Sequence, residues 1–300
     1  MERVTRIPDL PPRPREGHKG TFGTVLVAAG SPGMPGAAGL CAQAVLRAGA
    51  GLCKVACPEP VQPLVAVIAA GATSLPLETE TGFFQESHVQ RVLQEGAAAG
   101  TLAVGPGIDR GPGQERFLAR LVRETTVPTV VDADGLNALA GAAREPLERP
   151  EGAGALVLTP HPGEAARLLS LTSREVQEDR EGTAVKLARW CEGVCLLKGA
   201  DTVVTDGFRI YVNPTGNPGM ATGGSGDVLT GVIAALLAQG MKPFDAAVLG
   251  AWLHGRAGDL GSARLGPWSL TAQDLLEELP RAFLDRAAGK IGSEPARDQA

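Results

Sequence analysis

Three common signatures of nucleotide and acyl chemistry are missing from this sequence. It contains no Gly-x-x-x-x-Gly-Lys-Ser/Thr segment, which excludes a P-loop enzyme. No Gly-x-Gly-x-x-Gly follows the first expected strand, and there is no Gly-x-Ser-x-Gly nucleophile elbow. Any nucleotide that binds here must therefore be held in another way.

Charge and hydrophobic runs exclude further classes. The net charge is −5 without a basic cluster, so the electrostatic footprint of a nucleic-acid-binding protein is absent. Apolar runs such as residues 228–238 are too short to span a bilayer, and the acidic, proline-bearing N-terminus lacks the apolar stretch of a signal peptide. We expect a cytoplasmic protein that binds neither nucleic acid nor membrane.

Cysteine is sparse, and its pattern fits neither disulfides nor a metal site. The five cysteines are odd in number, scattered and surrounded by apolar residues, and the two pairs spaced four apart lack further ligands at metal-like spacing. We expect reduced, buried thiols that behave as small hydrophobic residues. They are Cys41, Cys53, Cys57, Cys191 and Cys195.

Short apolar runs alternate with helix-length segments, which predicts an α/β fold with a mostly parallel central sheet and helices on both faces. The expected strands are residues 24–29, 52–57, 101–104, 128–131, 155–158 and 194–197. Asp206-Gly207 separates two further β-rich runs and predicts a late antiparallel hairpin. We expect an extended lead-in over residues 1–20, one domain over 21–284 and a disordered tail over 285–300.

The expected helices include residues 36–48, 174–191, 244–260 and about 272–284. Thr172 with Glu175, and Thr271 with Asp274, have capping-box spacing and mark two helix starts.

One glycine-rich turn, Gly216-Asn-Pro-Gly-Met-Ala-Thr-Gly-Gly-Ser-Gly-Asp-Val-Leu-Thr-Gly231, leads into an apolar helix. Its glycines allow backbone N–H groups to converge with those of the helix start, which predicts an anion site suited to phosphate. Asp227 lies in the first turn, where it could simply favour the helix dipole. A carboxylate beside an anion site is better explained as a base that activates an oxygen nucleophile.

Unusual loops follow most of the predicted parallel strands. Because ligands gather at the carboxyl ends of such strands, we expect these loops to form one site. The loops are Gly30-Ser-Pro-Gly-Met-Pro-Gly36, Gly105-Pro-Gly107, Asp132-Ala-Asp-Gly-Leu-Asn137, Thr159-Pro-His-Pro-Gly-Glu164 and Lys198-Gly-Ala-Asp-Thr202.

The residues in these loops allow two interpretations each. His161 lies between two prolines that stiffen its backbone, and it is either a ligand-directed or an ordinary loop histidine. Lys198 could steer phosphate or form a salt bridge, and Glu164 could simply favour a helix dipole. Asp132, Asp134 and Asn137 could carry a hydrated Mg²⁺ or cap a helix. The metal ligands stay open, with Glu164, Asp132 and Asn137 as weak candidates.

Together, these motifs resemble the ADP-dependent NAD(P)H-hydrate dehydratases, which have the ribokinase-like fold. The resemblance runs from about residue 17 to 284 and includes His18-Lys-Gly-Thr-Phe-Gly23, Gly105-Pro-Gly-Ile108 and Asn217-Pro-Gly-Met-Ala-Thr-Gly-Gly-Ser-Gly-Asp-Val-Leu229. It implies a repair reaction in which the S epimer of NADH or NADPH hydrate is dehydrated at the expense of ADP, giving AMP and phosphate. Mg²⁺ would assist, and family members often form homo-oligomers.

Site residues follow from the same resemblance. Asp227 would deprotonate the 6-hydroxyl, while the amides of Gly224, Ser225 and Gly226 hold the phosphoryl charge. The residues implied to contact the hydrate are Ala37, Gly107, His161 and Asp227. Those implied to contact the adenine nucleotide are Lys198, Gly199, Ala200, Asp201, Thr202 and Gly226. Ser225 replaces the family's common threonine and keeps its backbone amide.

The match leaves only about twenty preceding residues, so we expect no fused epimerase domain and a separate epimerase acting on the same metabolite.

Two other functions stay open. A ribokinase-like kinase of a small alcohol or vitamin precursor could use the same Gly-Ser-Gly-Asp centre. A catalytically silent nucleotide sensor could keep the fold for binding, although such a binder would gain by losing the charge of Asp227.

Overall fold

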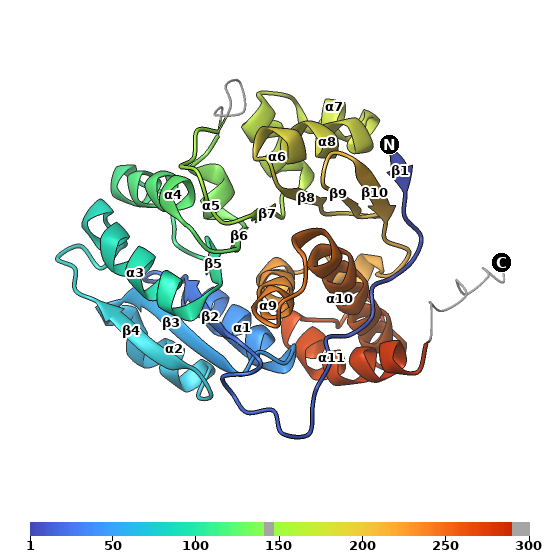
Figure 1. The fold of residues 1–300 in the computed structure, drawn as a ribbon, viewed down its shortest axis with the longest axis horizontal. Coiled ribbons are helices and arrows are strands. Elements are labelled where there is room, and N and C mark those ends of the chain that lie inside the picture. Colours follow the sequence, from blue (N-terminus) through green and yellow to red (C-terminus); the bar gives the residue numbers. More distant parts are fainter. Residues whose placement is uncertain (141–146, 290–300) are drawn as a thin grey trace.

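A ten-stranded sheet runs through the molecule in the order β1-β10-β9-β8-β7-β6-β5-β2-β3-β4 (Figure 1). The computed structural model describes residues 1–140 and 147–289. The strands are β1 (Glu2–Arg3), β2 (Thr24–Ala28), β3 (Leu52–Pro58), β4 (Thr73–Leu77), β5 (Leu102–Val104), β6 (Thr129–Val131), β7 (Leu156–Leu158), β8 (Val194–Leu197), β9 (Val203–Thr205) and β10 (Arg209–Val212).

Helices cover both faces of the sheet. One face carries α1 (Pro35–Arg47), α2 (Gln62–Ile68), α9 (Ser225–Ala238), α10 (Pro243–Leu265) and α11 (Ala272–Ala287). The other carries α3 (Val89–Ala99), α4 (Pro112–Glu124), α5 (Asp134–Asn137), α6 (Pro162–Leu169), α7 (Ser173–Glu178) and α8 (Arg180–Trp190).

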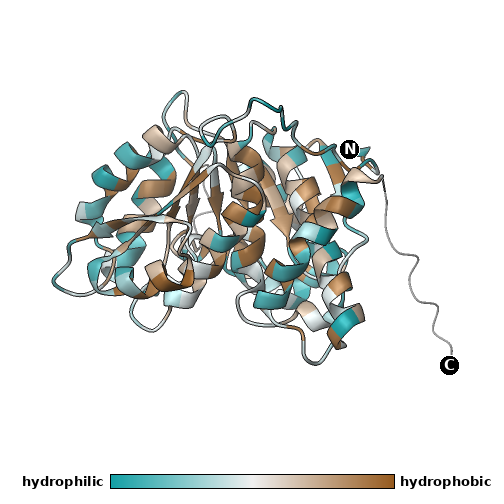
Figure 2. Cartoon of the chain, turned by 90° about the horizontal axis from the view of Figure 1, so that it is seen from below, coloured by the Kyte–Doolittle hydropathy of each residue, from teal (hydrophilic) through white to brown (hydrophobic). Residues whose placement is uncertain are grey.

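Both faces of the central strands are buried, which explains their continuous apolar sequences. Val25 and Val27 enter one hydrophobic core, whereas Leu26 and Ala28 enter the other. Figure 2 shows the hydrophobic strands enclosed between helices whose outer surfaces are more hydrophilic. The predicted α/β fold with a mostly parallel sheet is therefore confirmed.

The predicted hairpin is also confirmed, since β9 and β10 pair antiparallel around Asp206-Gly207. An Asp206 carboxylate oxygen accepts hydrogen bonds from the backbone N–H groups of Phe208 (3.0 Å) and Arg209 (2.7 Å), which fixes the turn. Strand β9 pairs antiparallel with β8 as well. The chain therefore reverses twice before it enters the glycine-rich segment.

The single helix predicted over residues 174–191 is wrong, because the structure has two helices there. Asp179 interrupts the run with φ −138°, and its side chain accepts a hydrogen bond from the N–H of Gly182 at the start of α8. An aspartate can offer the backbone this cap in place of a continuous helix. The predicted capping boxes of α7 and α11 are both present.

Strand β4 was not predicted, because Pro76 and its polar neighbours obscure it. It pairs with β3 at one edge of the sheet, where a proline costs no ladder hydrogen bond on the outer side.

The two terminal segments make contacts that were not predicted from the sequence. Strand β1 pairs parallel with β10, and Arg286 donates hydrogen bonds to the carbonyls of Ile7 (2.9 Å) and Pro8 (3.0 Å). Helix α11 continues to Ala287, so the predicted disordered tail is wrong for residues 285–287. The rest of that prediction falls partly on residues 290–300, outside the described part.

Within residues 1–140 and 147–289, no helix is long and apolar enough to cross a membrane.

Helices α1 and α9 approach closely through Gly231. A Cβ at this position would lie 2.3 Å from the carbonyl oxygen of Cys41 and 2.6 Å from the Cβ of Ala44. We expect Gly231→Ala to lower the free energy of unfolding by about 2 kcal/mol, because overpacking forces the two helices apart. Urea denaturation measures the change, and Gly113→Ala, whose Cβ would meet nothing closer than 3.6 Å, is the control. Equal midpoints for the two variants would contradict the prediction.

Candidate active site

The loops that follow the five central parallel strands meet at one edge of the sheet. The backbone N–H of Lys198 after β8 donates to the carbonyl of Pro160 after β7 (2.8 Å). The N–H of Gly30 after β2 donates to the carbonyl of Pro106 after β5 (2.9 Å). The predicted gathering of these loops is confirmed, because the strands are parallel neighbours whose carboxyl ends coincide.

Helix α9 presents its N-terminus to this edge. Gly224 is its N-cap with φ +87°, a left-handed conformation that favours glycine, and a Cβ there would lie 2.5 Å from Leu40. Ser225, Gly226 and Asp227 form the first turn, where the N–H groups have no intrahelical acceptors. The first turn therefore combines backbone N–H groups that lack intrahelical acceptors with the carboxylate of Asp227, and anion binding there stays a prediction.

Asp259 of α10 anchors the glycine-rich segment before α9. Its two carboxylate oxygens accept hydrogen bonds from the N–H of Gly216 and the Nδ2 of Asn217, each at 3.1 Å. The Asn217 Oδ1 in turn accepts from the N–H of Gly219 (3.0 Å). These hydrogen bonds from Asp259 and Asn217 thus fix the conformation of the glycine-rich segment.

A buried ion pair lies beneath the start of α9. The Lys198 Nζ is 2.6 Å from the Oδ1 of Asp132, whose Oδ2 accepts a hydrogen bond from the Thr230 hydroxyl (2.9 Å). A Cβ on Gly226 would lie 3.3 Å from both the Asp132 Oδ2 and the Lys198 Nζ. Because Gly226 has no side chain, the backbone at the start of α9 can pack closely against the Lys198–Asp132 ion pair.

Electrostatics keep Lys198 charged and make Asp227 a competent base. Burial opposes the ammonium, but the carboxylates of Asp132, Glu164 and Asp227 outweigh it and hold the pKa of Lys198 above its usual value. Burial raises the pKa of Asp227 to about 7; the Asp132 carboxylate adds to the rise and the Lys198 ammonium opposes it. A carboxylate with a pKa near neutrality is substantially ionised at physiological pH and is also more basic than an ordinary aspartate.

His161 and Glu164 form a second pair at the start of α6. The His161 Nδ1 accepts hydrogen bonds from the N–H groups of Gly163 (3.0 Å) and Glu164 (3.3 Å), so His161 is the N-cap of the helix. The Glu164 Oε2 accepts from the His161 N–H (2.8 Å), and the Oε1 lies 3.3 Å from the His161 Nε2. The ring proton therefore belongs on Nε2 and faces Glu164.

The strained backbone of Ala133, with φ +48°, separates two aspartates. Asp132 joins the Lys198 pair, whereas the Asp134 Oδ2 accepts from the N–H of Asp109 (2.9 Å). Asn137 donates to the Asp134 Oδ1 (3.3 Å) and accepts from the Arg167 Nε (2.9 Å).

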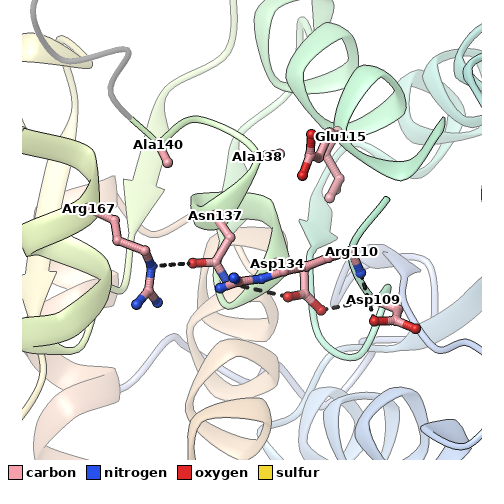
Figure 3. Close-up of a pocket in the computed structure, with 9 residues that line it drawn as sticks. Asp109, Arg110, Glu115, Asp134, Asn137, Ala138, Ala140 and Arg167 are labelled. Carbon is pink, nitrogen blue, oxygen red and sulfur yellow. Dashed lines mark hydrogen bonds between the residues drawn. The ribbon is translucent and has the colours of Figure 1, made fainter. Parts of the chain in front are cut away.

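Figure 3 shows the contacts of Asp134 and Asn137 in a pocket of the structure. Its lining residues are Asp109, Arg110, Glu115, Leu118, Asp134, Asn137, Ala138, Ala140 and Arg167. The structure thus places Asn137 in this pocket and separates it from Asp132.

Among residues 1–140 and 147–289, the carboxylates are not clustered as an all-protein metal cage. Both oxygens of Asp132 are engaged by Lys198 and Thr230, and both oxygens of Glu164 face His161. Within the described residues, no group of three or more His, Cys, Asp or Glu side chains is arranged to hold a metal ion. Mg²⁺ commonly binds through one or two carboxylates together with waters and substrate phosphates, so such a cluster is not required for it.

The remaining predicted contact residues are close to the same edge. Gly107 has φ +61°, and a Cβ there would lie 2.8 Å from the Cβ of Ala37, so these two predicted hydrate contacts touch. The segment from Lys198 to Thr202 is shaped by Arg180, which donates to the carbonyls of Leu197 (3.1 Å) and Lys198 (3.2 Å). The Thr202 hydroxyl donates to the Gly199 carbonyl (2.8 Å), which closes this turn.

Several supporting residues were missed by the sequence analysis. Thr230 is one turn beyond Asp227 on a buried helix, and that spacing was the available signal. His254 is buried in α10 with its Nε2 2.9 Å from the carbonyl oxygen of Ser225. Burial lowers the pKa of His254 to about 4, so a neutral ring steadies the start of α9. Nothing in the sequence signals Asp259 or Arg180.

Comparison with known proteins gives the class and then the family. The sheet and the glycine-rich helix start define a ribokinase-like protein, and the chain is similar to the crystal structure of the ADP/ATP-dependent NAD(P)H-hydrate dehydratase from Bacillus subtilis co-crystallized with ATP/Mg²⁺. The TM-score is 0.78 at 32% identity, covering 93% of this chain and 95% of the other. Residues 25–281 match the family model described as NAD(P)H-hydrate dehydratase. The chain therefore belongs to the NAD(P)H-hydrate dehydratase family.

Two sequence relatives support this membership. The bifunctional NAD(P)H-hydrate repair enzyme Nnr of Moorella thermoacetica is 49% identical over 247 residues, which are 81% of this chain and 46% of the relative. The ADP-dependent (S)-NAD(P)H-hydrate dehydratase of Neisseria meningitidis serogroup B is 47% identical over 159 residues, or 52% of this chain and 53% of the relative. The chain thus spans less than half the length of its bifunctional relative.

Proposed function

We propose that the protein dehydrates the S epimer of NADH or NADPH hydrate at the expense of ADP, giving NAD(P)H, AMP and phosphate. The observation that carries this proposal is the position of Asp227 in the first turn of α9, next to the glycine-rich helix start and within the influence of the Lys198 ammonium. A carboxylate with a raised pKa is suited to remove a proton from an alcohol. The family membership supports the nicotinamide hydrates as the alcohols on which this base would act.

The reaction has two stages in this proposal. Asp227 takes the proton from the 6-hydroxyl of the hydrate, and the oxygen attacks the terminal phosphorus of ADP, so that AMP leaves. The amides of Gly224, Ser225 and Gly226 hold the charge that develops on the transferred phosphoryl group. Phosphate then leaves carbon 6 as the ring-nitrogen lone pair forms a C=N bond. Loss of a proton from the adjacent carbon restores the dihydronicotinamide.

The binding roles follow from the family resemblance. His161, Ala37 and Gly107 would contact the hydrate, and residues 198–202 with Gly226 would contact the adenine nucleotide. Mg²⁺, when bound with the nucleotide, would neutralise phosphate charge. The Bacillus subtilis relative was crystallised with ATP and Mg²⁺, which supports binding of the cation together with the nucleotide.

The nucleotide donor and the further partners belong to the same proposal. The Neisseria meningitidis relative is named as ADP-dependent and the Bacillus subtilis relative as ADP/ATP-dependent, which supports ADP as one donor. A separate epimerase would convert the other hydrate epimer, and the homo-oligomeric state implied by the resemblance stays a prediction.

The experiment follows absorbance at 340 nm with purified protein, fresh NADH hydrate, Mg²⁺ and either ADP or ATP. A rise with ADP that is absent without nucleotide supports both the reaction and the donor. A rise with ATP alone would keep the reaction and overturn the donor. No rise with either would direct attention to small alcohols as kinase substrates, or to a sensor that binds ADP and hydrate without turnover.

The raised pKa of Asp227 predicts a pH dependence. The carboxyl group must be ionised to act as a base, so activity is present above its pKa and lost as pH falls through about 7. We expect kcat/KM for AMP formation to fall about tenfold for each pH unit below that value. Initial rates between pH 5 and 9 measure the profile. A flat profile across pH 5 to 7 would contradict the assignment of Asp227 as the base.

A further inference from the structure

Dehydration of the hydrate requires two proton acceptors, and only one has been assigned. This inference rests on the proposed function, in which Asp227 takes the hydroxyl proton. Once phosphate has left carbon 6, a second proton must leave carbon 5 to restore the ring double bond. Asp227 then already holds a proton and cannot serve as this acceptor without first releasing it. A side chain that accepts this proton would make the step independent of the departing phosphate and of water as bases.

Two side chains near Lys198 are excluded by their contacts. The His161 Nδ1 accepts two backbone N–H groups, and the Nε2 proton faces the Glu164 Oε1 at 3.3 Å, so a neutral His161 ring has no free lone pair. Asp132 lies at 2.6 Å from the Lys198 Nζ and also accepts from Thr230. Its negative charge is balanced by the shortest ion-pair contact in the site.

Glu164 is the remaining carboxylate beside Lys198. Its side chain is only 6% exposed, and its Oε2 lies 3.8 Å from the Lys198 Nζ, the same ammonium whose charge acts on Asp227. Each carboxylate oxygen accepts one contact from His161 and keeps a second lone pair. The capping-box geometry at the start of α6 fixes the orientation of this carboxylate.

We propose that Glu164 is the base that removes the proton from carbon 5 of the nicotinamide ring, and that His161 positions it. In this step the C5–H bond breaks and its electron pair forms the C5=C6 bond. The electrons of the C6=N bond return to the ring nitrogen, and the proton moves to the Glu164 carboxylate. The step consumes the cation left by phosphate departure and yields NAD(P)H.

The charges that face Glu164 are consistent with this role. Burial raises the pKa of Glu164 to about 7; the Lys198 ammonium opposes that rise, the Asp132 carboxylate adds to it, and Arg167 lowers it slightly. The facing His161 has its own pKa lowered, first by burial and then by Lys198 and Arg167, so its ring stays neutral at physiological pH. Two carboxyl groups with raised pKa values, Asp227 and Glu164, therefore interact with the ammonium of one lysine.

The test is Glu164→Gln, because glutamine keeps the N3 capping contact but is not a base. In the variant, the ring cation cannot lose its proton quickly, so water adds again at carbon 6 and regenerates the hydrate. We expect NADH formation to fall about 100-fold while AMP formation stays within about threefold of wild type. The ratio of AMP to NADH should rise from one to at least about thirty. Replacing the hydrogens on carbon 5 with deuterium should raise the ratio further in the variant.

The matched control is Glu175→Gln, the same change at the N3 position of the capping box of α7. It should leave both rates and their ratio unchanged. An AMP-to-NADH ratio of one in Glu164→Gln, whether both rates fall equally or neither falls, would overturn the inference while the wild-type activity stands. A wild-type protein that forms neither AMP nor NADH would overturn the proposed function and this inference with it.

Discussion

Asp227→Asn should lower the rate of AMP and NADH formation by about a thousandfold, because an amide cannot accept the hydroxyl proton during phosphoryl transfer. The substitution preserves the shape of the first turn of α9, and the backbone N–H groups of that turn stay in place. Nucleotide affinity should therefore stay within about threefold of wild type, or improve slightly through the loss of a negative charge. Initial rates and calorimetric titration with ADP measure the two effects.

The control for this variant is Asp274→Asn, which makes the same change at the N3 position of α11, where Asp274 bonds to Thr271. Its turnover should match wild type. Turnover of Asp227→Asn within tenfold of wild type would remove Asp227 from the role of base. A parallel loss of ADP affinity would instead assign Asp227 to nucleotide binding.

Lys198→Met should lower the free energy of unfolding by about 3 kcal/mol, since it leaves the buried carboxylate of Asp132 without its counter-ion. Asp132 is 1% exposed, and its remaining partner is the Thr230 hydroxyl. The same variant removes the cation beside the proposed nucleotide segment, so ADP affinity should fall at least about tenfold. Urea denaturation and ADP titration separate the two consequences.

A second substitution distinguishes the structural role of Lys198 from its binding role. Asp132→Asn added to Lys198→Met removes the stranded charge, so stability should largely recover while ADP binding stays weak. Lys54→Met is the matched control, because the Lys54–Glu95 pair at 2.8 Å is more exposed and should contribute less than about 1 kcal/mol. A loss below that value in Lys198→Met would mean that the Asp132 charge is stabilised by something other than Lys198.

The sequence was sufficient wherever a local signal decided the structure. The apolar strands, the Asp206-Gly207 turn and the glycine start of α9 are each encoded within a few consecutive residues. Parallel strands then bring their loops to one edge without further information. The position of Asp227 could therefore be predicted before the fold was known.

The missed features depend on contacts between distant segments or on competition between local signals. Asp179 could have continued a helix, but its side chain caps the next one. Asn137 belongs to the same motif as Asp132, but the two residues lie on either side of the positive-φ residue Ala133 and contact different partners. Asp132 pairs with Lys198, whereas Asn137 accepts from Arg167. Both oxygens of Asp132 are taken by residues from other strands and helices, which no spacing rule could reveal.

The ion pair beneath α9 also constrains how the protein can acquire activity during folding. Lys198 and Asp132 are 66 residues apart, and Thr230 and Asp132 are 98 residues apart. Contacts of such long sequence separation form late, after the entropy of closing large loops has been overcome. A nucleotide site built on this ion pair would form in the same late stage. In refolding experiments, recovered ADP binding should therefore lag behind recovered helix content.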